Sequence, residues 1–268
     1  MAVTANKKFE SLQEFSTWLE ATPKHESFPV EESRRKEYHE NFYGTETYED
    51  SQRLMLNGWD SGAVDVSKIM LERANEYEKV KRLYLDYAGA VPCVPAYLSG
   101  SPANMIAIRK RPNGAPVVTL CYSMSISYDE TSKDILLYSA KLLNVVRGLE
   151  AGGVKINLYV GIFAKRRNDE ACCIVKIKDS REPVNVLNMA YPLTHPSFLR
   201  RQGFAYTERC GVDYHNGWSG YGRVLDDRGK QKEITESLGI LNPVCIGYYD
   251  LTKKTESEIT EMIQQQLR

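Results

Sequence analysis

The clearest pattern of hydrophobic and polar positions lies in residues 116–164. An apolar run at 117–127 ends in alternating serines, a stretch with helical periodicity follows at 133–150, and a second apolar run occupies 154–164. This succession predicts a βαβ unit and therefore an α/β protein. The chain leaves the first strand through serines, at the carboxyl end where α/β folds place ligands.

The N-terminal third has the pattern of helices joined by polar connectors. Residues 9–21 and 47–57 each contain a hydroxyl residue followed three positions later by an acidic one, which is the capping-box pattern of a helix start. A longer and more charged helix is predicted over 64–86, and Pro and Gly interrupt residues 88–100. The chain is therefore predicted to have two parts: a helical N-terminal extension, 1–88, and an α/β domain, 89–268.

The rest of the α/β part continues the alternation of strands and helices. Its predicted elements are a strand at 105–111, a hairpin strand at 171–178, two short helices split by Pro192 and Pro196, a long Gly-rich loop at 208–232, a helix at 231–238, a last strand at 243–250 and a last helix at 253–267. Together they predict a mostly parallel, Rossmann-like sheet flanked by helices.

Composition narrows the class of protein. The chain has 268 residues and 42% hydrophobic residues, which permits a large core. Lys+Arg and Asp+Glu both number 35, so the net charge argues against a dedicated nucleic-acid binder, although a local basic stripe stays compatible with it. No apolar run approaches the ~18 residues of a membrane span. Six cysteines without a CxxC pair indicate free thiols, and we expect a soluble, cytoplasmic protein.

The order of strand, serine-rich turn, helix, strand, antiparallel strand, helices, strand and helix resembles the von Willebrand factor A (VWA) fold. In that family an Asp-x-Ser-x-Ser motif after the first core strand forms the metal-ion-dependent adhesion site (MIDAS). A Thr from a second loop and an Asp after a later strand help to hold Mg²⁺ there. In the matching turn, Ser123 stands in place of the Asp and is followed by Ser125 and Ser127, while an alternative register places Cys121 first.

The resemblance implies a degenerate metal motif, because the anchoring carboxylate is missing. It makes Asp250 the counterpart of the later Asp and Thr194 that of the loop Thr. We expect no cofactor, and we expect the hydroxyls to cap the next helix or to bond neighbouring loops. The alternative is a Mg²⁺ ion held by Ser123, Ser125, Thr194 and Asp250.

Further segments are similar to uncharacterised proteins encoded by bacteriophages and prophages. FESLQEFSTWLE, YLSGSPANMI, KLLNVVRGLEAGGVKINL and HPSFLRRQGFAYTE carry this resemblance, which spans roughly residues 9–210. Those proteins pair a small helical N-terminal region with a VWA-like domain. The resemblance implies a phage origin, and hence the cytoplasm of a host cell, but it implies no mechanism.

The residues that could support nucleophilic catalysis are scattered. His195 and His215 are candidate bases, and Cys210 or a serine of 123–127 is a candidate nucleophile. No Gly-x-Ser-x-Gly elbow accompanies them. His195 precedes Pro196, which favours a role at a helix start. We therefore expect a protein that is not an enzyme.

The leading hypothesis is a non-catalytic interaction module that binds a protein partner at the carboxyl ends of the strands. The glycine-rich segment GWSGYGR lacks a Walker lysine, so we interpret it as a contact loop. The partner-binding residues are predicted to be Ser123, Ser125, Ser127, Asp250, Trp218 and Tyr221.

The alternative hypothesis is a phage protein that binds single-stranded DNA or RNA. Three basic clusters on one face, with loop aromatics for stacking, would track a phosphate backbone. The residues concerned are Arg109, Lys110, Arg111, Lys165, Arg166, Arg167, Arg200, Arg201 and Arg223.

Overall fold

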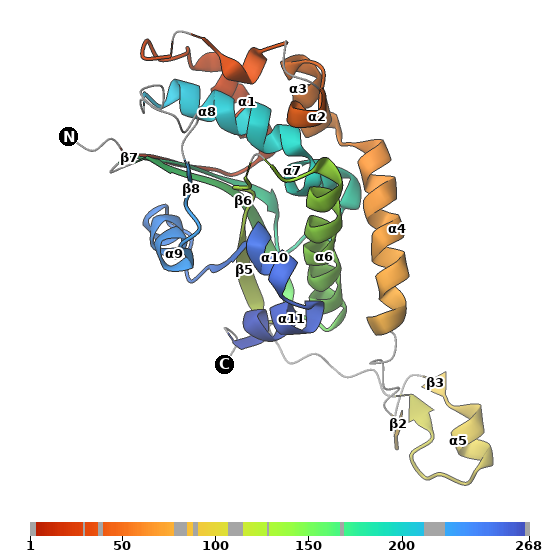
Figure 1. The fold of residues 1–268 in the computed structure, drawn as a ribbon. Helices are drawn as coiled ribbons and strands as arrows, with labels where there is room; N and C mark the ends of the chain where they lie inside the picture. Colours follow the sequence, from red (N-terminus) through yellow and green to blue (C-terminus); the bar gives the residue numbers. More distant parts are fainter. Residues whose placement is uncertain are drawn as a thin grey trace.

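A mixed, mostly parallel sheet forms the centre of the protein (Figure 1). The computed structural model describes residues 4–28, 30–36, 40–77, 85–87, 91–106, 115–127, 129–166, 169–211 and 223–265. The strand order is β1-β7-β6-β5-β9, and the short β8 pairs with β6. The strands are β1 (Thr4–Phe9), β5 (Val117–Ser123), β6 (Lys155–Arg166), β7 (Asp169–Lys178), β8 (Arg223–Val224) and β9 (Val244–Gly247).

The predicted βαβ unit and the α/β class are confirmed. Strand β5 leads through α6 (Ser132–Ala151) into β6, and β6 lies parallel to β5. Strand β9 also lies parallel to β5, whereas β7 returns antiparallel to β6 as the predicted hairpin. Helix α6 begins at Ser132, one residue before the predicted start, and the Thr131 hydroxyl caps it by accepting the Asp134 N–H.

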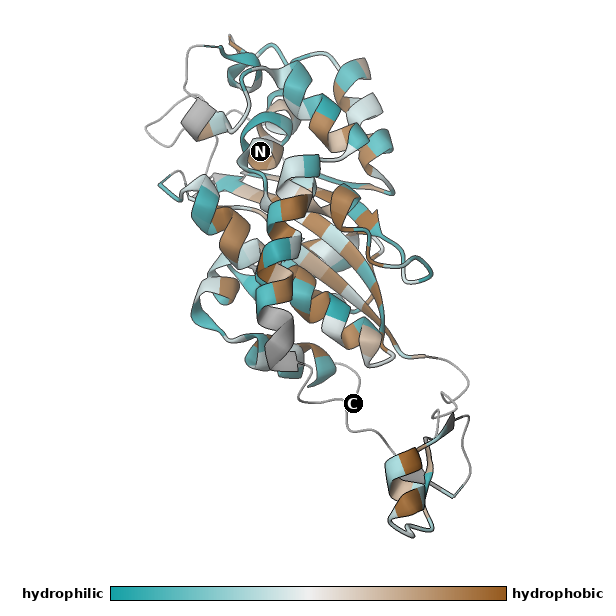
Figure 2. Ribbon diagram, turned by 90° about the vertical axis from the view of Figure 1, so that its right-hand side faces the viewer, coloured by the Kyte–Doolittle hydropathy of each residue, from teal (hydrophilic) through white to brown (hydrophobic). Residues whose placement is uncertain are grey.

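Helices cover both faces of the sheet. Alternate residues of β5 separate two cores: Leu120 and Tyr122 belong to the larger one, and Cys121 packs in the smaller one with Ile234 of α9 (Arg228–Ser237). Figure 2 shows hydrophobic residues concentrated along the strands and the helices beside them. The helices over the larger core include α1 (Leu12–Ala21), α3 (Tyr48–Asn57), α4 (Asp60–Tyr77), α7 (Val186–Thr194), α8 (Phe204–Arg209), α10 (Tyr248–Lys253) and α11 (Glu256–Gln264).

The N-terminal residues form part of the main sheet. Strand β1 pairs in parallel with β7, from Thr4 opposite Glu170 to Phe9 opposite Val175. The hydrophobic pattern does not predict β1, because its half-exposed edge position lets the strand be polar and only Phe9 of the strand is buried. Helix α1 adds Phe15 to the larger core. Residues on both sides of the predicted boundary at 88/89 therefore share one hydrophobic core.

Residues 85–106 contain a second, small sheet. Its order is β2-β4-β3, with antiparallel pairing throughout. Figure 1 shows it beyond the lower end of α4, apart from the main sheet. The helix predicted over 64–86 is wrong at its end, because residues 85 and 86 form a strand. The elements of this unit are β2 (Leu85–Asp86), β3 (Val91–Pro92), α5 (Val94–Leu98) and β4 (Met105–Ile106).

A continuous helical segment after α7 carries two consecutive buried arginines. It contains a π-helix at Phe198–Gly203 and continues into α8. A π-helical turn adds a residue to the ordinary helical turn and redirects the side chains that follow. Beside it lie a 3-10 helix at Glu32–Arg34 and the short α2 at Glu40–Tyr43. This helical segment joins the connector between α1 and α3 to the rest of the protein.

Candidate functional site

The serine-rich turn lies where the parallel strands β5 and β9 end, beside the middle of β6. Ser123, the last residue of β5, is in register with Gly161 of β6 and with Gly247 of β9. The chain passes from β5 to β6 on one side, while β9 flanks β5 on the other. Such a switch in strand order opens a crevice at the carboxyl ends of the strands, which is a common ligand position in open α/β sheets.

The two first serines of the turn have different surroundings. Ser125 is buried, and its Oγ donates to the Phe163 carbonyl (3.0 Å) and accepts the Phe163 N–H (2.6 Å). It therefore continues the pairing of the two strands after β5 has ended. Ser123 is only 2% exposed, and among the described residues its Oγ has no hydrogen-bond partner.

The glycines beside Ser123 leave room for two larger side chains. A Cβ on Gly161 would overlap the Phe163 ring, and a Cβ on Gly247 would overlap the Arg228 guanidinium. Because Gly247 lies in register with Ser123, the guanidinium covers the end of β9 next to the unpaired hydroxyl. An aromatic ring and a cation thus flank Ser123.

Asp250 is already engaged in interactions inside the protein. Its Oδ2 accepts the Gly247 N–H (2.8 Å) and the Arg228 Nε–H (2.6 Å), so it caps α10 and forms an ion pair. The Arg228 Nη2 also lies 2.7 Å from Asp226 Oδ1. The last strand ends at Gly247, earlier than predicted, so Asp250 belongs to the first turn of α10.

The residues that the VWA resemblance assigns to Mg²⁺ do not fit that ion. Thr194 is buried within α7 and donates to the Ala190 carbonyl (2.8 Å). The Ser125 hydroxyl is used by the Phe163 backbone, and the Asp250 Oδ2 accepts from Gly247 and Arg228, so that carboxylate already has a cation beside it. A magnesium site needs several oxygen ligands that converge on one point. Within the described ranges, no cluster of three or more His, Cys, Asp or Glu residues could hold a metal.

Hydrogen bonds tie the loop after β5 to the start of α10. The Ser127 N–H donates to the Tyr249 hydroxyl (3.3 Å), and the Tyr248 hydroxyl donates to the Glu130 carboxylate (2.9 Å). From the other side, the Arg200 Nη2 donates to the carbonyls of Ser127 (3.2 Å) and Glu130 (3.4 Å). The two loops therefore present one braced surface.

That surface is acidic. Asp129 is exposed, and hydrogen bonding to Ser127 lowers the pKa of its carboxyl, so the group is charged at neutral pH. Asp226 is exposed on the neighbouring loop. Burial raises the pKa of Tyr249, and the charges of Glu130, Asp129 and Asp226 raise it further, which places this phenol among three carboxylates. Ser123 and Ser125 are buried, so they cannot themselves contact a partner as predicted, whereas Ser127 and Asp250 are partly exposed. We use the name strand-end face for Ser127, Asp129, Glu130, Asp226, Arg228, Tyr249 and Asp250.

The helix start that positions Arg228 lies inside the Gly-rich loop predicted at 208–232. Residues 226–230 instead lead into α9, because the Asp227 carboxylate accepts the Lys230 N–H (3.1 Å). An Asp immediately before a helical pattern is a usual N-cap and could have indicated this start. The pairing of Arg228 with Asp250 depends on strand order, which the local pattern does not contain.

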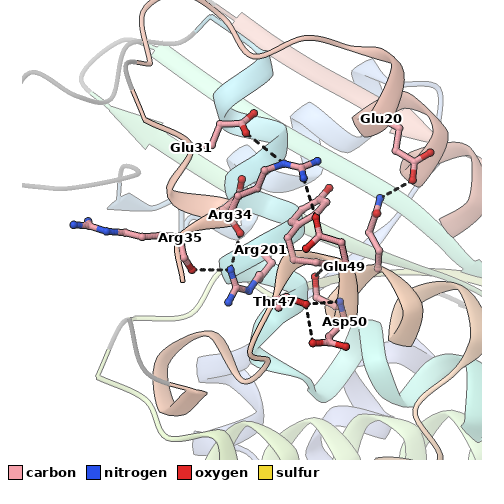
Figure 3. A network of polar contacts seen from close by, with 12 residues as sticks. Glu20, Glu31, Arg34, Arg35, Thr47, Glu49, Asp50 and Arg201 are labelled. Carbon is pink, nitrogen blue, oxygen red and sulfur yellow. Dashed lines mark hydrogen bonds and ion pairs between the residues drawn. The ribbon is translucent and has the colours of Figure 1, made fainter. Parts of the chain in front are cut away.

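Two of the predicted nucleic-acid contacts are wrong, because Arg200 and Arg201 are 3% and 1% exposed. All five N–H groups of the Arg201 guanidinium are used. They donate to the Thr45 hydroxyl and to the carbonyls of Ser33, Arg35, Thr45 and Glu46. Figure 3 shows this guanidinium inside the connector network. Two adjacent arginines in a sequence usually indicate a solvent-exposed segment. Here the Arg201 guanidinium is buried because it donates to the backbone carbonyls of the connector between α1 and α3.

The other predicted contacts are only partly described. Lys165 is exposed at the end of β6, and Arg166 and Arg223 lie in β6 and β8. The remaining residues lie outside the described residues: Arg109, Lys110, Arg111, Arg167, Trp218 and Tyr221, together with His215.

His195 has the helix-start role that Pro196 suggested. It is buried, and its Nδ1 accepts the Ser197 N–H (3.2 Å) and lies 2.6 Å from the Ser197 Oγ. Burial lowers the pKa of the imidazole to about 4, so the ring is neutral at pH 7. The Ser197 hydroxyl also lies 2.9 Å from the Tyr191 hydroxyl. This buried group fixes the turn between two helices.

Comparison with known proteins identifies a family but no function. The sequence model of the family described as a domain of unknown function (DUF7192) matches residues 2–267, and the chain belongs to this family. No curated protein and no solved structure matches the chain. Among the described helices, none is both long enough and apolar enough to span a bilayer.

Proposed function

We propose that the protein is a non-catalytic interaction module that binds a protein partner through the strand-end face. The observation that carries the proposal is the bracing of two loops at the carboxyl ends of β5 and β9. The Ser127–Tyr249, Tyr248–Glu130 and Arg200 contacts fix this surface before a partner arrives. A preorganised surface loses little conformational entropy on binding.

The charge of the face favours a basic partner. Asp129 and Asp226 extend into solvent, and the half-buried Tyr249 ring lies among the carboxylates. A lysine or arginine of the partner would gain both ion pairing and a cation–π contact there. The VWA-like topology and the phage origin belong to the same proposal: a VWA-like module in which Arg228, rather than a metal ion, holds Asp250.

Site-specific photo-crosslinking tests this proposal. A photoreactive amino acid replaces Asp129 in one variant and Arg181 in a matched control. Arg181 is 88% exposed and follows β7 at the other end of the sheet, beyond the carboxyl end of this antiparallel strand. The proposal predicts a protein adduct from position 129 and none from position 181.

The variant pair Asp129→Asn and Asp226→Asn should reduce the yield of the adduct, and added salt should reduce it as well. Equal adducts from both positions would contradict the assignment of the face. An adduct that disappears after nuclease treatment would instead support the nucleic-acid hypothesis. Lys165 is the residue of that hypothesis that the described part of the chain shows to be exposed.

A further inference from the structure

Strand β1 has an open edge. One side of β1 pairs with β7, and no strand among the described residues pairs with the other side. An edge strand presents unpaired backbone N–H and C=O groups, which can accept an additional strand from a partner. This edge belongs to the opposite border of the sheet from β9, so it is distinct from the strand-end face.

A groove of about 580 Å³ lies beside this edge, between β1 and α1. Its volume falls in the range of ~300–1,000 Å³ that is usual for ligand sites. The lining residues include Lys7 and Phe9 of β1 and Gln13, Glu14, Thr17 and Trp18 of α1. A strand added to β1 would therefore place alternate side chains against the flank of a helix.

Lys7 provides a cation within the groove. Its side chain is exposed, and its Nζ lies 4.7 Å from the Trp18 ring centroid and 5.7 Å from that of Phe9. No carboxylate in the described part of the chain forms an ion pair with it. The next residue differs, because Lys8 pairs with Glu10 at 2.7 Å and points to the other face of the sheet. Edge lysines commonly discourage strand pairing, but the position of Lys7 over two rings keeps the charge beside an apolar surface.

The floor of the groove is rigid. The rings of Phe9, Trp18 and Tyr206 contact one another, with centroids 5.2–6.4 Å apart. The Tyr206 hydroxyl donates to the Ala5 carbonyl (2.9 Å) and so links β1 to α8. The N-terminal end of α1 is fixed as well, because the Glu14 carboxylate accepts the Glu10 N–H (2.7 Å). The site is therefore formed before binding.

We propose that the groove between β1 and α1 binds an extended segment of a partner protein by strand addition. In this arrangement an acidic side chain of the segment pairs with Lys7, and an apolar side chain two positions away packs on Trp18. The carboxylate supplies the counter-charge that Lys7 lacks, and the open backbone groups of β1 bind any extended chain. Charge selects the segment, because main-chain bonds carry no sequence information.

The test uses an array of synthetic extended peptides of about eight residues. They are rich in Val, Thr and Tyr and are made in pairs that differ only by Glu or Gln at the central position. The intact protein should bind the Glu members about tenfold more tightly than their Gln partners. Lys7→Gln should abolish this preference, and the matched control Lys8→Gln should retain it. Hydrogen exchange should show new protection of the β1 amides when a Glu peptide is added.

Three outcomes would overturn the proposal. The first is the absence of binding by every peptide. The second is equal affinity for the Glu and Gln members. The third is self-association of the protein through β1, detected by light scattering and removed by substitutions in β1, because a second copy would then be the occupant of the edge.

Discussion

The Arg201 Nη2 donates to the Thr45 carbonyl oxygen over 2.9 Å, and this bond joins residues 156 positions apart in the sequence. The same guanidinium lies 4.2 Å from the Tyr43 ring centroid and also binds the carbonyls of Ser33 and Arg35. One side chain thus holds the connector between α1 and α3 against the π-helix. Nearby, the buried Glu208 carboxylate accepts the Ser33 N–H (2.9 Å) and stabilises the same connector.

Replacing Arg201 should therefore destabilise the whole fold. We expect Arg201→Met to lower the free energy of unfolding by about 3 kcal/mol or more, because buried carbonyls lose their donors. Arg201→Lys should recover only part of this loss, since an ammonium cannot reach four carbonyls in a plane. Urea unfolding measures the stability of both variants. Arg53→Met is the control, because the Arg53 side chain is 68% exposed. A loss as small as that of the control would show that the network contributes little.

The two serines after β5 provide a matched pair of substitutions. Ser125→Ala should cost about 1–3 kcal/mol, because the N–H and C=O of Phe163 lose their shared partner. Ser123→Ala should change stability by less than about 0.5 kcal/mol or increase it, because the hydroxyl that it removes has no hydrogen-bond partner in the described part of the chain. Urea midpoints compare the two variants directly. Equal losses would mean that the Ser123 hydroxyl is bound in solution.

Stability should fall in mild acid because of His195. Burial lowers the pKa of His195 from 6.5 to about 4, so between these values the unfolded chain binds a proton that the folded chain does not. The contribution is fully present above pH 6.5 and is lost as the pH falls toward 4. Between pH 7 and pH 5 it should decrease the free energy of unfolding by about 2 kcal/mol.

His195→Asn should remove this part of the pH dependence, because the amide oxygen can still accept the Ser197 N–H without titrating. His25 gives a matched control. It forms the same pair of contacts with Ser27 two residues later, but its ring is exposed. His25→Asn shows what the same substitution does at an exposed ring. If His195→Asn leaves the pH dependence as it is in the unsubstituted protein, His195 does not titrate in this range.

Of two deletions, the shorter one should destabilise the protein more than the longer one. Replacing residues 79–114 by a flexible Gly/Ser linker of about 20 residues should leave the main domain folded. The described residues of that segment contribute nothing to the larger hydrophobic core. Removing residues 1–9 should lower the thermal midpoint markedly, because it deletes β1 and buried Phe9. Circular dichroism melts would decide, and a stable N-terminal deletion would show that the sheet does not need β1.

Some features followed from the sequence because their causes are local. The βαβ unit, the hairpin of β6 and β7 and the starts of the helices after Thr47 and Thr131 depend on periodicity and on caps within a few residues. The serine hydroxyls after β5 were expected to cap the next helix or to bond neighbouring loops, whereas Ser125 bonds the Phe163 backbone within β6.

Tertiary structure decided the rest. Strand β1 has no hydrophobic alternation and is a strand only because β7 offers it an edge. The burial of Arg201 requires carbonyls from a connector far away in the sequence, and the pairing of Arg228 with Asp250 requires β9 to lie beside β5. Whether a charged side chain is exposed or buried depends on which segments the fold packs around it. The sequence therefore determined the class of fold and its local elements, while long-range packing determined which polar residues became structural and which remained available for a partner.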